Sequence, residues 1–257
     1  MDRRGFLTTT AAATAAAGAV SAAPEPAARE LYEVRTYHLA NDEKLAKMEA
    51  YLAQAVVPAL NRRGLKPVGV FAPAPQTADR RIFVLIPHAT AATVLSAARL
   101  VDDPEFARAG AELLALPPTD ALYTRYESAL LHAFAGMPKL EAPAVDKPRI
   151  FELRIYESHN ERTGDKKVEM FDKGEIDIFR RTGLQPVFFG QSLVGAAMPN
   201  LTYMLTYPDA AGRKKAWDAF LADPAWKKLS TTAGYTNREI ITRITAHNLA
   251  PLACSQV

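Results

Sequence analysis

Two stretches of the chain alternate polar and apolar residues at the period of a β-strand. Residues 31–39 read LYEVRTYHL, and residues 150–158 read IFELRIYES. In each stretch a Glu, an Arg and a Tyr occupy alternate positions, with apolar residues or Thr between them. Because successive side chains of a strand point to opposite faces, each stretch predicts a strand with one Glu-Arg-Tyr face and one mainly apolar face.

Each predicted strand is followed by a segment with the apolar spacing of an amphipathic helix, over about 42–62 and 161–182. Asn41 is the predicted N-cap of the first helix, and Gly64 and Gly183 are predicted to end the two helices. The apolar positions that recur every three or four residues in the first helix are Leu45, Met48, Leu52, Val56 and Leu60.

The remaining pattern also occurs twice, in the same order. Two short strands follow the helix, KPVGVF and RIFVLI in the first half and QPVFFG and LTYMLTY in the second. A second helical stretch, interrupted by an Asp-Pro pair in DDPEF (102–106) and ADPAW (222–226), leads to closing strands predicted over 121–129 and 238–247. The matching motifs lie 118 to 120 positions apart, which indicates an internal repeat.

The order β-α-β-β-α-β is that of a ferredoxin-like unit, an antiparallel sheet with both helices on one face. We therefore predict an α+β fold with two tandem units, residues 31–131 and 150–249, joined by a linker over 132–149 that contains Pro and Gly. The uncovered faces of the two sheets are predicted to pack on each other as one intramolecular barrel.

The first 22 residues, MDRRGFLTTTAAATAAAGAVSA, are typical of an export signal rather than of the fold. Arg3 and Arg4, followed by Phe6 and Leu7, resemble the twin-arginine signal, with a general secretory signal as the alternative. The prediction is export to the periplasm or the extracellular space, with cleavage before Ala23. The Ala/Thr-rich run is too short for a permanent membrane span.

Composition excludes several classes of function. A formal charge of +3 gives no electrostatic case for binding nucleic acid or anionic lipid. Cys254 is the single cysteine, so no intramolecular disulfide forms. The five histidines have no spacing that would build a metal site, and no metal is predicted.

The YEVRTY and FELRIY strands, the RRGLKPV and RRTGLQPV helix exits and the Asp-Pro-x-aromatic corners resemble NIPSNAP domains, within the dimeric α+β barrel superfamily. The resemblance covers both units and implies the barrel fold, but it implies no settled chemistry. Analogy with barrel relatives suggests cofactor-independent oxygenation or isomerisation. Other barrel relatives hold haem through one axial His, so haem stays as a minor alternative to the prediction of no cofactor.

With the apolar face of each strand assigned to the helices, the Glu-Arg-Tyr faces are predicted to point into the barrel lumen. By the same assignment Phe151, Leu153, Ile155 and His38 are predicted to face the helices, and His247 the lumen. The predicted lumen residues are Glu33, Arg35, Tyr37, Arg125, Glu152, Arg154, Tyr156, Arg243 and His247.

Two interpretations of these residues remain open. They could form a polar pocket for a small organic molecule, in which Arg binds an anionic oxygen and Glu, Tyr or His moves a proton. They could instead form a closed ion network that only specifies sheet pairing. The first interpretation predicts a ligand-binding barrel or enzyme, and the second a non-catalytic protein that binds a partner or, through its sheet edges, another copy of itself.

Overall fold

Eight antiparallel strands close into a barrel in the computed structural model, which describes residues 28–75 and 78–257. The predicted export signal lies outside the described residues. The order of strands around the barrel is β1-β3-β2-β8-β5-β7-β6-β4. Unit 1 supplies β1 (Leu31–His38), β2 (Gly69–Pro73), β3 (Arg81–His88) and β4 (Arg125–Ala133). Unit 2 supplies β5 (Ile150–Glu157), β6 (Gln185–Val194), β7 (Asn200–Tyr207) and β8 (Arg243–Pro251).

The predicted α+β fold with two units of the same element order is confirmed. Each unit forms a four-stranded sheet, and the two sheets join where β2 pairs with β8 and β4 with β6. Because each described strand has a neighbour on both sides, the barrel offers no free sheet edge for pairing with another copy. An oligomer built by edge pairing, which the sequence left open, is therefore not available to these strands.

The long helix of each unit contains a π-helical turn in its middle. In unit 1, α1 (Asp42–Tyr51) and α2 (Val57–Arg62) flank the turn Leu52–Val56, and in unit 2, α6 (Glu161–Met170) and α7 (Ile176–Thr182) flank Phe171–Glu175. Asn41 accepts a hydrogen bond from the Lys44 amide, as predicted for an N-cap. Gly64 and Gly183 adopt positive φ after the helices, as the predicted stops require.

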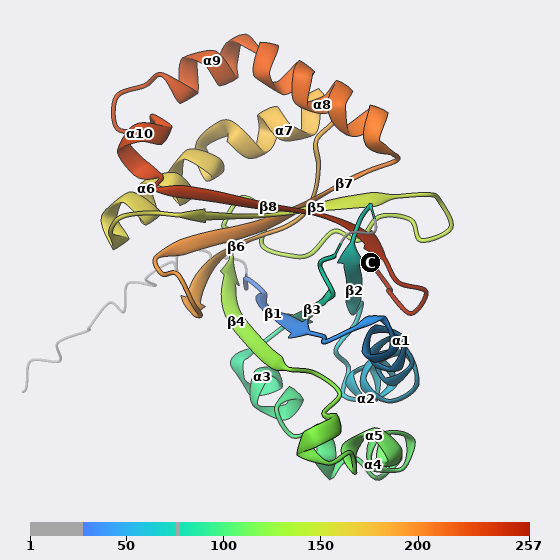
Figure 1. Cartoon of the computed structure of the whole chain (residues 1–257). Helices are drawn as coiled ribbons and strands as arrows, with labels where there is room; N and C mark the ends of the chain where they lie inside the picture. The colour runs from blue at the N-terminus through green and yellow to red at the C-terminus, as the bar shows by residue number, and fades with distance from the viewer. Residues whose placement is uncertain (1–27, 76–77) are drawn as a thin grey trace, which may run out of the picture.

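The second helical stretch is more fragmented in unit 1 than in unit 2. Unit 1 has α3 (Ala91–Ala97), α4 (Pro104–Ala109) and α5 (Ala111–Leu114), with 3₁₀ turns at Leu100–Asp102 and Pro118–Asp120. Unit 2 has α8 (Ala210–Ala222), α9 (Pro224–Ser230) and α10 (Asn237–Ile240). Figure 1 shows the two helical layers on opposite sides of the barrel.

The two closing strands begin later than the sequence pattern predicted. β4 begins at Arg125 rather than 121, and β8 at Arg243 rather than 238. The residues before β4 form the 3₁₀ turn Pro118–Asp120, and α10 occupies the start of the predicted second strand. In α10, Thr236 and Glu239 form a capping box, which favours a helical turn there.

Three apolar cores stabilise the molecule. One lies under the helices of unit 1, one under the helices of unit 2, and the third inside the barrel, where residues of both units meet. The barrel core includes Val257, which is fully buried because the segment after β8 folds back along β2. The amide of Gln256 donates to the carbonyl oxygen of Val68 in this segment. Large side chains therefore fill one end of the barrel.

Candidate functional site

The Glu-Arg-Tyr faces of β1 and β5 lie outside the barrel, beneath the helices. Tyr37 packs in the core under the helices of unit 1, and Tyr156 in the core under the helices of unit 2. Tyr32 and Phe151, from the alternate positions, pack inside the barrel. The predicted lumen position is therefore wrong for six residues: Glu33, Arg35, Tyr37, Glu152, Arg154 and Tyr156. The prediction that Phe151, Leu153 and Ile155 face the helices is also wrong, because these three side chains face the barrel interior.

The reason for this inversion is that alternation shows which side chains share a face but not which face is inside. Most of the barrel interior is filled by packed apolar side chains, so a charged set placed there would lack partners. The helices outside bring such partners. Arg213 and Trp217 of α8, for example, both donate hydrogen bonds to Glu152.

In unit 1 the charged pair is held by few partners. Arg35 Nε lies 2.6 Å from Glu33 Oε1, Arg35 Nη2 lies 2.9 Å from Glu33 Oε2, and Ser128 Oγ donates to Glu33 at 2.9 Å. His88 Nε2 lies 3.6 Å from Glu33 Oε2. Burial alone would raise the pKa of Glu33, but His88, Arg35 and Ser128 outweigh it and lower the pKa to about 2.

In unit 2 the corresponding carboxylate is enclosed by donors. Glu152 is fully buried and accepts hydrogen bonds from Arg154 at 2.6 Å, Arg213 at 2.8 and 2.9 Å, Trp217 at 2.9 Å and Tyr207 at 3.2 Å. Burial tends to raise the pKa of Glu152, and these donors outweigh it and lower the pKa. This arrangement fits the closed ion network that the sequence left as one interpretation.

The barrel lumen contains a cavity of about 390 Å³ at the end where β1 and β5 finish. Val34, Leu153 and Ile155 form part of its apolar wall. Polar groups gather where the strands begin or end, and Glu127, Glu157, Ser192, Asn200, Thr202 and Thr245 all line the cavity. An apolar cavity with a few polar groups at its mouth is the usual form of a site for a small organic ligand.

Glu127, one of the carboxylates that line this cavity, is paired with a histidine. His38 Nε2 lies 2.8 Å from Glu127 Oε2, and Arg125 Nη2 lies 2.6 Å from Glu127 Oε1. Thr36, Glu127 and His38 share the inward face because Thr36 pairs with Glu127, and His38 with Arg125, across β1 and β4. His38, followed by Arg125, holds the pKa of Glu127 below its usual value, although burial opposes this shift.

The prediction that His38 faces the helices is therefore wrong, for the same reason as for the six charged and Tyr positions. The sequence does contain a signal that could have identified it. His38 follows Tyr32, Val34 and Thr36 at strand spacing, so once Tyr32 is placed inside the barrel His38 must lie on the inward face at its mouth.

Three of the nine predicted residues do lie on the inward face. Arg125 and Arg243 are at the mouth with 67% and 71% of their side chains exposed, and Arg243 Nε is 4.0 Å from Glu157. His247, opposite Leu153, packs its ring 5.2 Å from that of Phe83. The predicted inward position of His247 is confirmed. Burial, followed by the charge of Arg81, lowers the pKa of His247, so its imidazole is neutral near pH 7.

His247 is not placed as an axial haem ligand. Its ring lies against Phe83, and its Nδ1 is 3.4 Å from Arg81 Nη2. The neighbouring Arg81 guanidinium disfavours a metal cation bound to this imidazole. Across residues 28–75 and 78–257, no group of three or more His, Cys, Asp or Glu is arranged to hold a metal. No helix in the same ranges is long and apolar enough to cross a membrane.

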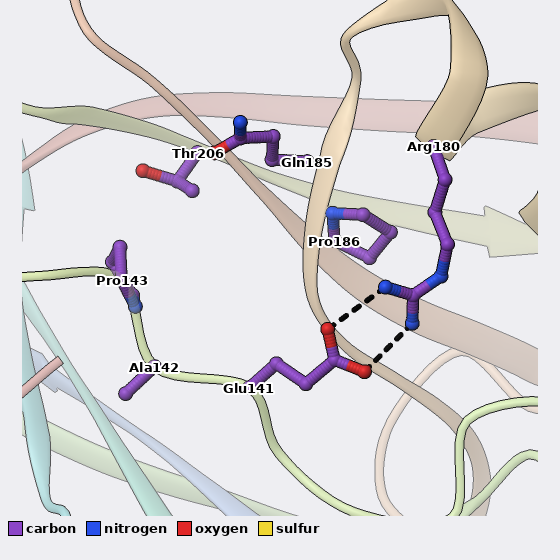
Figure 2. A pocket seen from close by; sticks show the side chains of 7 residues that line it. All are labelled: Glu141, Ala142, Pro143, Arg180, Gln185, Pro186 and Thr206. Carbon is purple, nitrogen blue, oxygen red and sulfur yellow. Dashed lines mark hydrogen bonds and ion pairs between the residues drawn. The ribbon is translucent and has the colours of Figure 1, made fainter.

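A separate hollow of about 330 Å³ lies under the linker, outside the barrel (Figure 2). Figure 2 shows Glu141 of the linker facing Arg180 of α7, with two hydrogen bonds of 2.7 and 2.9 Å between them. Both side chains of the pair are about half exposed. Because each charge is satisfied by the other, we interpret this pair as the attachment of the linker to unit 2.

Residues 151–256 match the family model described as NIPSNAP. A comparison with curated proteins found no match. The matched residues cover nearly all of unit 2, so this part of the chain is similar to NIPSNAP domains, in agreement with the resemblance in the sequence.

Two solved structures with the same architecture match nearly the whole chain, and a third matches less than half of it. A candidate monooxygenase from Lactobacillus acidophilus is 9% identical, with 87% of this chain and 94% of that chain covered and a TM-score of 0.59. An anthrone oxidase-like protein is 8% identical, with 87% and 91% covered and a TM-score of 0.53. A NIPSNAP-like domain protein from Burkholderia xenovorans is 19% identical over 41% of this chain and 86% of its own, with a TM-score of 0.37. At these identities the first two show a shared fold.

Proposed function

We propose that the cavity of the closed barrel, in a chain whose residues 151–256 match the NIPSNAP family model, binds a small organic molecule, and that the cavity mouth removes a proton from that molecule. The observation that carries this proposal is Glu127, which lines a largely apolar cavity of about 390 Å³ and lies 2.8 Å from His38 Nε2. The apolar wall would hold the body of the ligand, and the polar mouth would orient its reactive group.

The geometry of the pair suits general base catalysis. When the Nε2 hydrogen of His38 is donated to Glu127, the lone pair of the neutral imidazole is on Nδ1, which is then the atom that accepts a proton. Glu127 would stabilise the imidazolium that forms and fix the ring orientation, as the carboxylate does in other His-carboxylate pairs. Arg125, bound to the other oxygen of Glu127, keeps that carboxylate ionised.

The reaction class that fits this site is cofactor-independent oxygenation or isomerisation. Removal of a proton from a carbon next to a carbonyl gives an enolate. Return of the proton to another carbon completes an isomerisation. In an oxygenation, the enolate carbon forms a bond to O₂, the peroxide takes the proton back, and loss of water breaks the O–O bond and converts a CH₂ group into a second carbonyl. The names of the two fold neighbours, a candidate monooxygenase and an anthrone oxidase-like protein, support this choice by analogy of fold only.

The test begins with native mass spectrometry and an absorption spectrum of the mature protein purified from its own host. A co-purified small molecule that is lost from Val34→Trp, which fills the cavity wall, supports the proposal. A bare polypeptide mass that a metabolite extract does not shift favours the alternative, a non-catalytic barrel that binds a protein partner.

A second measurement tests the base. With the identified ligand, hydrogen-deuterium exchange of its acidic C–H is expected to slow by about 10²-fold or more in His38→Asn, since a positioned base contributes about 10²–10⁴-fold. His159→Asn is the matched control, because His159 is exposed and lies outside the cavity. Equal exchange rates in both variants would contradict the assignment of His38.

We also infer that the chain is exported by the twin-arginine route, from Arg3 and Arg4 in the sequence. Replacement of both by Lys is expected to leave the protein uncleaved inside the cell, which fractionation and the mass of the N-terminal peptide would detect. Continued export of that variant would favour the general secretory route.

A further inference from the structure

Unit 1 contains a second hollow, of about 330 Å³, between the outer face of its sheet and its helices. Glu33, Arg35 and Tyr37 of β1 line it on the sheet side, and Ala97 and Ala98 line it on the helix side. It therefore lies outside the barrel, separated from the lumen by the sheet itself. Arg35 is 6% exposed, so its guanidinium is a buried charge at the base of the hollow.

The same place in unit 2 is filled by an indole ring. The Arg154 guanidinium carbon lies 4.8 Å from the centre of the Trp217 ring, and Trp217 Nε1 donates to Glu152 at 2.9 Å. The ring thus makes a cation–π contact with the arginine and a hydrogen bond with the glutamate. Both contacts help to satisfy the buried Glu-Arg pair of this unit.

Ala98 of unit 1 occupies the position that corresponds to Trp217. The helices α3 and α8 begin after the N-caps Thr90 and Asp209, which are 119 positions apart, as are Ala98 and Trp217. The preceding residues, Ala97 and Ala216, are buried in equivalent cores.

The two units also differ in the length of the helix that covers this space. α3 ends at Ala97, whereas α8 continues to Ala222 and covers more of its sheet. Unit 1 therefore lacks both the ring and part of the helix that close this space in unit 2.

The entrance of the hollow is built from tyrosine rings. Tyr37 and Tyr126 are stacked with ring centres 5.0 Å apart, and Tyr123 meets Tyr37 edge-on at 5.5 Å. Tyr123 and Tyr126 are 41% and 42% exposed, so aromatic faces and hydroxyl groups border the opening. Aromatic rings favour stacked or edge-on contacts with other rings.

We propose that this hollow binds a small planar aromatic molecule whose ring takes the place that the Trp217 indole has in unit 2. The ring would lie over the Arg35 guanidinium, and an N–H or O–H group on the ring would donate to Glu33. Since Arg35 and Glu33 neutralise each other, the ligand class is a neutral aromatic with one hydrogen-bond donor, such as an indole or a phenol. The proposal does not rest on the activity assigned to the lumen.

Indole itself is the probe for this site, with binding measured by isothermal titration calorimetry and by ligand-detected NMR on the full mature chain. Ala98→Trp is expected to weaken indole binding at least tenfold, because the new side chain fills the hollow. Leu95→Trp is the matched control, since Leu95 lies on α3 three residues before Ala98 with 74% exposure, and it is expected to bind indole like the wild type.

Val34→Trp separates this site from the lumen and is expected to bind indole unchanged. Loss of binding in Val34→Trp with retention in Ala98→Trp would assign indole to the lumen and overturn the proposal, as would no binding to the wild type. If Ala98→Trp does not fold, indole binding to Tyr123→Ala tests the site instead. Its exposed ring borders the opening, so its removal is expected to weaken binding severalfold, and unchanged binding would contradict the site.

Discussion

The Lys167 ammonium lies 2.6 Å from the Glu175 carboxylate, and the two side chains are only 1% and 3% exposed. The ammonium also lies 4.5 Å from the ring centre of Phe171. Both charges are thus desolvated under the helices of unit 2, where each is the principal compensation for the other.

Removal of one partner of this pair is expected to be strongly destabilising. Lys167→Met leaves the Glu175 carboxylate buried without its counter-ion, and we expect a loss of about 3–5 kcal/mol in the free energy of unfolding. The double variant Lys167→Met/Glu175→Leu is expected to recover most of that loss. Urea unfolding measures both, and Lys214→Met, which removes an exposed ion pair with Asp218, serves as the control. A double variant as unstable as the single one would contradict this account.

The Glu33 carboxyl makes the free energy of unfolding depend on pH. Its pKa is lowered from the ordinary 4.5 to about 2 in the folded chain. A lowered carboxyl pKa stabilises the fold above the unfolded value, and that contribution is lost as pH falls from about 4.5 to about 2. A difference of this size corresponds to about 3 kcal/mol.

Unfolding free energies at pH 7 and pH 3 test this dependence. The difference between wild type and Glu33→Gln is expected to shrink on acidification, because the unfolded wild-type carboxyl becomes protonated. A constant difference for Glu33→Gln would show that its pKa is not lowered.

Much of the fold could be predicted because its signals are local. The strand alternation around Glu33 and Glu152, the Asn41 cap and the positive-φ glycines Gly64 and Gly183 each depend on a few neighbouring residues. Two copies of the same order then limited the architecture to paired ferredoxin-like units. The closing strands were placed early because short helical turns before them carry weak patterns.

The site was predicted less well because the direction of a strand face depends on distant parts of the chain. Glu152 faces outward because α8, about 60 residues later, brings Arg213 and Trp217 to it. The hydrophobic pattern alone cannot say whether helices or the opposite sheet provide the better partner for a charged face. His38 and Glu127, 89 positions apart, become neighbours only through the pairing of β1 with β4.

Two glycines are expected to respond in opposite ways to the same substitution. A Cβ at Gly190 in β6 would lie 2.8 Å from the Leu131 Cβ on the neighbouring strand, so Gly190→Ala is expected to cost about 1–3 kcal/mol through overpacking. A Cβ at Gly164 in α6 meets its nearest atom at 3.6 Å, so Gly164→Ala is expected to gain about 0.5–1 kcal/mol. Thermal unfolding of the two variants shows whether each substitution stabilises or destabilises the fold. Destabilisation by Gly164→Ala would mean that α6 packs more tightly on Pro199 than its geometry indicates.

The Glu141–Arg180 pair in Figure 2 is expected to contribute little to stability despite its ideal geometry. Its side chains are 52% and 41% exposed, and exposed ion pairs are typically worth less than about 1 kcal/mol. Arg180→Ala is therefore expected to lower the free energy of unfolding by less than about 1 kcal/mol, and by even less in high salt. Arg213→Ala, which takes two donors from the fully buried Glu152, is expected to cost more in parallel urea unfolding. Equal costs would mean that the linker attachment supports unit 2 as strongly as the buried network does.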